Sequence, residues 1–137
     1  MSPGSRVGEV MMRHDRASES LGMTVLTNEP GRSVVTMTIR DDMLNGFAIT
    51  HGGFVFALAD TAFAIACNDS DLVTVAAGAD IAFLKATTAG DVLTATAIER
   101  AKSGRSGIYD VEVLDATGSV VAEFRGRSRR TSSPAPV

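Results

Sequence analysis

The sequence predicts an α+β fold in which a curved antiparallel β-sheet wraps around one long central helix. The first observation is residues 54–68, a segment rich in Ala and Phe that is apolar on nearly every side. A helix of this kind has to be enclosed by other structure, because no face of it suits water. The second observation is the series of strand-like segments that follow it, separated by short polar turns.

The other elements are expected in the following order along the 137 residues. Residues 1–8 should fray, and a short amphipathic helix should run from Val10 to about Ser20, with Gly22 ending it. The polar residues 68–71 should end the central helix. We expect one domain over residues 1–130 and a disordered Ser/Pro-rich tail over 131–137. The predicted strands are residues 23–27 and 33–39, joined by a turn at 28–31, and then 73–83, 92–98, 108–114 and 120–127.

The predicted sheet covers one side of the central helix only. It also leaves an edge strand whose N–H and C=O groups have no partner within the chain. Both features favour association with a second copy, so we expect a dimer or a larger homo-oligomer.

Composition excludes several classes of function. The formal charge of −3 argues against non-specific nucleic-acid binding, which needs a strongly basic surface. A single cysteine, Cys67, excludes an intramolecular disulfide framework and suits a reducing cytosol. Residues 1–30 contain no secretory signal pattern, and no apolar run is long enough to span a bilayer. We therefore expect a cytoplasmic protein without nucleic-acid or membrane partners. Two histidines and one cysteine, widely spaced, predict no metal site.

Asp60 is the residue that fits its surroundings least well. It lies in the middle of the predicted helix, between apolar residues such as Phe56 and Phe63. Burial removes hydration from a carboxylate and raises its pKa, and such perturbation is common in catalytic acids and bases. The alternative is a structural Asp that caps another element or pairs with a buried Arg.

His51-Gly52-Gly53 marks the start of the same helix. Two glycines leave room for a ligand to approach the free N–H groups of the first turn, where the helix dipole favours a developing oxyanion. The alternative is a tight turn with no other role. Asp60 lies seven residues after Gly53, on roughly the same face and about 10 Å along the axis. A partner subunit could bring the two features closer together.

Two further features allow both a functional and a structural interpretation. Asn45 precedes the helix and could orient a carbonyl or a water, although Asn45-Gly46 also suits a plain turn. Basic residues gather near the expected end of the sheet, where they could bind the phosphates of coenzyme A or form a solvated strand end. These basic residues are Lys102, Arg105, Arg125, Arg127, Arg129 and Arg130.

Taken together, these segments resemble the PaaI-type hotdog thioesterases of the phenylacetate pathway. The resemblance rests on residues 43–46 (MLNG), 51–53 (HGG) and 58–68 (LADTAFAIACN), with residues 79–86 and 104–113 similar to two later strands. It covers about residues 11–130. The segment from Asn45 to Asp60 is specific, whereas the strands are common to hotdog proteins.

The resemblance implies a hotdog fold, a dimer of dimers, and hydrolysis of an aryl-acetyl-CoA or a related thioester at a site between subunits. It implies that Asp60 is the catalytic carboxylate and that the Gly53 amide polarises the thioester carbonyl, with Asn45 and His51 beside the reacting group. No cofactor is expected, since coenzyme A is part of the substrate. The residues expected to contact substrate are Gly52, Phe54, Thr61, Phe83, Lys85, Gly104 and Arg105.

The chemistry expected of Asp60 is either activation of a water as general base or direct attack on the thioester to give an anhydride. One alternative function is a hotdog hydratase or dehydratase that uses His51 and Asp60 as its acid and base. Another is a non-catalytic module that binds acyl-CoA.

Overall fold

The protein folds as a curved six-stranded sheet around a 16-residue helix, α3. A computed structural model describes residues 6–135. All strand pairs are antiparallel, and the strand order is β1-β2-β4-β5-β6-β3. The elements are α1 Arg6–His14, α2 Arg16–Ser20, β1 Thr24–Glu29, β2 Arg32–Thr38, the 3-10 helix η1 Asp41–Met43, α3 Gly52–Cys67, β3 Leu72–Phe83, β4 Val92–Ser103, β5 Ser106–Leu114 and β6 Val120–Pro134.

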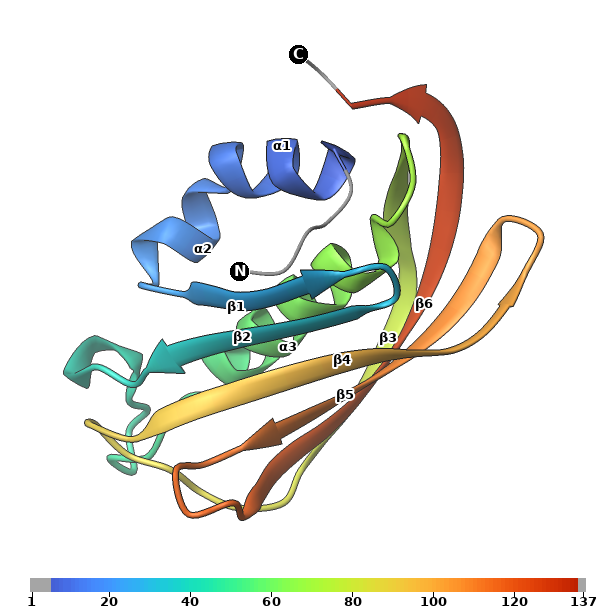
Figure 1. Cartoon of the computed structure of the whole chain (residues 1–137). Helices are drawn as coiled ribbons and strands as arrows, with labels where there is room; N and C mark the ends of the chain where they lie inside the picture. The colour runs from blue at the N-terminus through green and yellow to red at the C-terminus, as the bar shows by residue number, and fades with distance from the viewer. Residues whose placement is uncertain (1–5, 136–137) are drawn as a thin grey trace.

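The concave side of the sheet holds α3, while α1 and α2 lie on the side that the sheet leaves open (Figure 1). This is the predicted hotdog arrangement, and it is confirmed. Alternation along the strands explains the core: Tyr109, Val111 and Val113 of β5 are fully buried, whereas Asp110 and Glu112 face outward. Inward-facing side chains of the strands thereby enclose the apolar surface of α3.

The C-terminal end of α3 is fixed by one side chain, that of Asn68. Its Nδ2 donates to the carbonyl oxygens of Ala64 (2.8 Å) and Thr74 (3.1 Å), and its Oδ1 accepts from the Thr74 N–H (2.9 Å). Asn68 therefore ends the helix, as predicted, and also attaches it to the start of β3.

The N-terminal segment differs from its prediction. Two helices replace the single expected one, because Asp15 interrupts the first and caps the second by accepting from the Ser18 N–H. Gly22, with φ of +70°, follows α2 and ends it as expected. Residues 6–8, expected to fray, belong to α1, and residues 1–5 lie outside the described part.

The predicted disordered tail is wrong for Thr131–Pro134, which form the end of β6. Thr131 Oγ1 donates to the carbonyl of Val73 (2.7 Å), and Leu72 pairs with Pro134. Ala135 is buried against Val7 and Val10 of α1. The strand continues because α1 and the start of β3 offer it an apolar surface and backbone partners; residues 136–137 lie outside the described part.

Two of the six strands lie at the edges of the sheet. β1 pairs only with β2, and β3 pairs only with β6. β3 is a 12-residue strand on which Val75 and Phe83 are 45% and 55% exposed. A long, partly apolar edge strand is a surface suited to pairing with another chain. Within the described residues, no helix is long and apolar enough to cross a membrane.

Candidate active site

The loop before α3 is held in one conformation by Asn45. Its Oδ1 accepts from the backbone N–H groups of Phe47 (2.8 Å) and Ile49 (3.4 Å). Between them Ala48 adopts a positive φ of 60°, which is uncommon for a residue other than glycine. The Nδ2 group of Asn45 donates to no protein acceptor among residues 6–135, so it is available to a ligand. Asn45 therefore forms the predicted turn and also presents an amide.

The first turn of α3 has one engaged and one available amide. His51 is the N-cap, and its Nδ1 accepts from the Gly53 N–H (2.9 Å). The imidazole therefore occupies the Gly53 donor in this structure, and the expected role of Gly53 as an oxyanion donor stays a prediction. Among the described residues, the Gly52 N–H donates to no protein group. Gly52 thus supplies the open amide at the positive end of the helix dipole.

The bond from Gly53 also settles the tautomer of the neutral His51 ring. Since Nδ1 accepts a hydrogen bond, the proton of the neutral imidazole resides on Nε2. His51 is exposed and can turn this second donor toward a ligand at the same helix end as the Gly52 amide.

Phe83 explains why position 52 has no side chain. A Cβ at Gly52 would lie 2.9 Å from Cζ of the Phe83 ring. The ring is 55% exposed and stands over the glycine. Asn45, Gly52, Phe83 and Lys85 are brought together around one cavity of about 430 Å³. The other lining residues are Ile49, Thr50, Val55, Leu84, Ala86, Thr87 and Val121.

Lys85 reaches this cavity but is not a free cation. Its Nζ forms an ion pair with Asp115 in the turn between β5 and β6. The ammonium, two backbone N–H groups and the Thr117 hydroxyl together hold the pKa of Asp115 well below its usual range. Lys85 therefore anchors that turn to the cavity wall.

Asp60 lies on the part of α3 that the sheet does not cover. Six exposed or partly exposed positions form a stripe that follows the helix period, and no described residue hydrogen-bonds to the Asp60 carboxylate. Burial raises the pKa of Asp60, and the negative charge of Asp15 raises it further. The stripe consists of Gly53, Phe56, Ala57, Asp60, Thr61 and Ala64.

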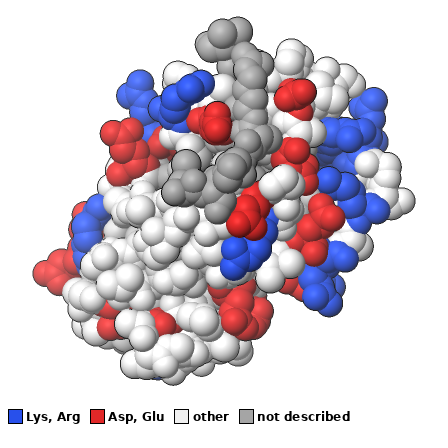
Figure 2. Space-filling model, in the orientation of Figure 1, with Lys and Arg blue, Asp and Glu red and all other residues white. Residues whose placement is uncertain are grey.

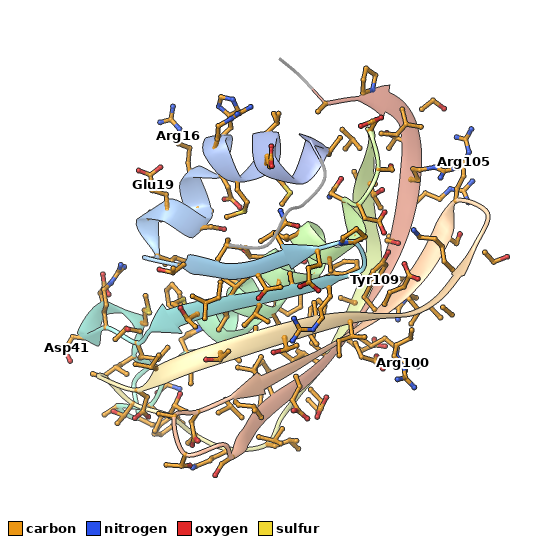
Figure 3. The ribbon with its side chains drawn as sticks, viewed as in Figure 1. Arg16, Glu19, Asp41, Arg100, Arg105 and Tyr109 are labelled. Carbon is orange, nitrogen blue, oxygen red and sulfur yellow. The ribbon has the colours of Figure 1, made fainter. Side chains whose placement is uncertain are left out.

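The remaining predicted residues lie apart from the cavity. The Thr61 hydroxyl is bonded to Ser18 of α2 (2.9 Å), and Phe54 packs edge-on against His51. Gly104 and Arg105 form the tip of the β4–β5 hairpin, with Gly104 at φ of +59°. Figure 3 shows Arg105 at one end of the sheet and Asp41, in η1 just before the Asn45 loop, at the other. One chain therefore does not bring all the predicted residues to one place.

Basic side chains gather at the hairpin end. Figure 2 shows Lys and Arg gathered on the side where that hairpin and the end of β6 lie in Figure 1, while the opposite side carries charges of both signs. Lys102 is paired with Asp69 and Glu99, whereas Arg105 donates only to the Ser132 hydroxyl among the described residues. Of these two cations, Arg105 is therefore the more accessible to a phosphate.

Sequence reasoning missed Asp15 and Ser18, which approach Asp60 from α2. Their signal was the Asp-x-x-Ser pattern of an N-cap, which lay within a longer expected helix.

Cys67 is a core residue, as expected. Burial raises the pKa of its thiol to about 12, which leaves little thiolate for chemistry. Within residues 6–135, no group of His, Cys, Asp and Glu is arranged to hold a metal ion.

Comparison with known proteins gives consistent matches. Residues 47–122 match the family model of the thioesterase superfamily. Acyl-coenzyme A thioesterase PaaI of Escherichia coli strain K12 is 45% identical over 120 residues, which cover 88% of this chain and 86% of that protein. A solved structure of the E. coli PaaI protein from the phenylacetic acid degradation operon has a TM-score of 0.92 at 41% identity, covering 96% of this chain and 95% of that one. A variant of the phenylacetic acid degradation protein PaaI from Thermus thermophilus has a TM-score of 0.80 at 38% identity, covering 83% and 97%.

Proposed function

This chain belongs to the thioesterase superfamily and is a thioester hydrolase, and we propose that it converts aryl-acetyl-CoA thioesters to the free acid and CoA. The observation that carries the proposal is the cavity at the start of α3. There an aromatic ring, Phe83, stands beside the open amide of Gly52. The ring can stack on an aryl group while the amide binds the adjacent carbonyl oxygen. The relatives named after phenylacetic acid degradation support the same substrate class.

The carbonyl end of the site would consist of donors only. The Gly52 N–H and the Nε2–H of His51 can converge on the thioester oxygen, with the dipole of α3 behind them. Asn45 Nδ2 can orient the thioester or a water. Donors fixed before the reaction stabilise the developing oxyanion without reorganisation, and each such donor contributes about 10²–10³-fold to the rate.

Asp60 would supply the base or the nucleophile. It can take a proton from water, or it can attack the thioester carbon and form a mixed anhydride that water then hydrolyses. The departing thiolate needs little acid assistance, because a thiol pKa is only about 8–9. A single turnover in ¹⁸O-labelled water tests the anhydride route, since label that enters the Asp60 carboxyl supports the anhydride.

The separation within one chain requires a second subunit. Asp60 lies eight residues after Gly52, which is about 12 Å along the helix and too far for one carbonyl group to reach both. If two β3 edges pair antiparallel about a two-fold axis, the Phe83 end of each strand lies at the Leu72 end of the other. The Gly52 cavity of one chain then faces the uncovered side of α3 in its partner. We propose that each site combines the Gly52 donors of one subunit with Asp60 of the other.

The same pairing would bring the basic hairpin to the cavity. In one chain Arg105 lies at the opposite end of the sheet from Asp41 of η1, which precedes the Asn45 loop, and antiparallel pairing places the partner's hairpin at the near end. Guanidinium groups suit the phosphates of CoA because they donate in pairs. Gly104 would allow the close approach of the turn. Assembly of two such dimers into a tetramer remains our prediction.

The test is a thiol-release assay with aryl-acetyl, benzoyl and straight-chain acyl-CoA substrates. We expect kcat/KM to be highest for the aryl-acetyl thioesters and to fall about 10²–10⁴-fold in Asp60→Asn, whose folding should be intact. Faster hydrolysis of straight-chain substrates would contradict the substrate assignment. Retained activity in Asp60→Asn would contradict the role of the carboxylate. Consumption of an enoyl thioester without thiol release would instead indicate a hydratase.

A further inference from the structure

A chain of hydrogen bonds connects α2 to α3 beside Asp60. Asp15 accepts from the Ser18 N–H (2.9 Å) through Oδ1 and from the Ser18 hydroxyl (2.6 Å) through Oδ2. The Ser18 hydroxyl also lies 2.9 Å from Oγ1 of Thr61, the residue after Asp60. Ser18 is only 2% exposed, so water does not compete for these bonds.

The direction of this chain follows from the number of protons. A serine hydroxyl has one hydrogen, and Ser18 donates it to the carboxylate of Asp15. An ionised carboxylate has no proton of its own, so it can act only as an acceptor. In the bond between the two hydroxyls, Thr61 is therefore the donor. The order is Thr61 to Ser18 to Asp15, and it fixes an ionised carboxylate next to the helix turn that carries Asp60.

Few other charges face Asp60. The polar strand residues that pack on α3 include Ser33 of β2, whose hydroxyl donates to the carbonyl of Ala62 (2.6 Å), and Tyr109 of β5, whose hydroxyl donates to Glu99 (3.2 Å). On α1, His14 lines a cavity together with Asp15, and on α3 itself Cys67 lies two turns further along. Among the described residues, Asp15 is the group whose charge acts on the Asp60 carboxyl.

We propose that Asp15 is a positioning residue for the reaction: through Ser18 and Thr61 it holds a second negative charge beside Asp60, which makes Asp60 a stronger base or nucleophile. This inference rests on the proposed catalytic role of Asp60. The direction in which Asp15 moves the pKa of Asp60 agrees with it. Helix capping alone does not require the charge, because Asn and Ser cap helices about as well as Asp.

The test is the pH dependence of kcat/KM in Asp15→Asn. Asn keeps the cap and removes the charge, so we expect the acidic limb of the profile to move down by roughly 0.3–1 pH unit. The plateau should fall about two- to threefold, because Asp60 becomes a weaker base. Asp15→Ser, which also caps, is a second neutral variant in case the first folds poorly. Glu19→Gln removes an exposed carboxylate from the same helix and should leave the profile unchanged.

The outcomes separate this inference from the proposed function. If Asp60→Asn is inactive while the profiles of both neutral Asp15 variants coincide with that of the wild type, the role of Asp15 is overturned and that of Asp60 stands. If Asp60→Asn retains activity, the proposed catalytic role of Asp60 fails, and the premise of this inference fails with it. A shift of equal size in Glu19→Gln would reduce the effect to general surface charge and would also overturn the inference.

Discussion

Gly52 is constrained at the residue scale by both of its neighbours. Its amide is left open because His51 caps the next residue, and its Cα is covered by the Phe83 ring. Any side chain at position 52 has to displace the Phe83 ring. That ring is 55% exposed, so it has room to move. The cost should therefore appear in the geometry of the site more than in stability.

We predict that Gly52→Ala lowers kcat/KM about 10- to 100-fold while the melting temperature changes little, because a displacement of about 1 Å in a reacting group has an effect of this size. Adding Phe83→Ala should remove the clash and restore the position of the amide. Gly46→Ala, where a Cβ meets no atom within 4 Å, is the matched control. Equal activity of Gly52→Ala and Gly46→Ala would contradict the role of the Gly52 amide.

Asp60 should reduce stability at the pH at which it acts. Its pKa is raised in the folded state, so the fold binds the proton more tightly than the unfolded chain does. The ionised form is therefore destabilising above the folded-state pKa, and the penalty vanishes below the usual aspartate range of about 4.

Asp60→Asn should accordingly melt about 1–3 °C above the wild type at pH 7–8, with the difference disappearing as the pH falls toward 4. Thermal unfolding followed by circular dichroism across this pH range measures it. Asp71→Asn, at an exposed carboxylate, provides a comparison. A lower melting temperature of Asp60→Asn at pH 7 would contradict this prediction, because it would mean that the ionised Asp60 carboxylate stabilises the fold.

The sequence alone could identify Asp60 and the glycine-led helix start, because a carboxylate within an apolar helix and paired glycines are visible as residue types. It could not show which amide is open. That depends on the rotamer of His51 and on Phe83, thirty-one residues away, and neither follows from local pattern. Asp15 was missed for the same reason, since its electrostatic effect on Asp60 arises only in the tertiary structure.

At the scale of elements, β6 and α1 stabilise each other. The last residues of β6 pair with the start of β3, and Ala135 packs on Val7 and Val10. Ending the chain after Arg130 should remove these contacts and lower the free energy of unfolding by about 1–3 kcal/mol. A chain that ends at Ala135 keeps all of them and is the control. Identical denaturation midpoints for the two truncations would show that residues 131–135 contribute nothing.

The order of the elements was predictable because the spacing of apolar residues indicates helix or strand, and turn residues mark where each element ends. The central helix and all six strands were found, with boundaries that differ by a few residues except at the ends of β4 and β6. The end of β6 could not be predicted, since Ser and Pro indicate a tail and only the tertiary surface of α1 and β3 overrides that preference.

At the scale of the whole molecule, the edge of β3 and the uncovered side of α3 lie on neighbouring surfaces of one chain. Both surfaces must meet a second copy, because the Gly52 donors and Asp60 are too far apart to act on one thioester within a subunit. The central claim is therefore that each active site is shared between two chains.

Subunit complementation tests this claim most directly. Asp60→Asn and His51→Ala subunits, each nearly inactive alone, are dissociated, mixed in equal amounts and reassociated. A shared site restores one intact centre in each mixed dimer, so random association should give about a quarter of wild-type specific activity. If each site lay within one chain, every centre in the mixture would carry a substitution. Activity no greater than the mean of the two variants, with mixed dimers shown to have formed, would contradict the account.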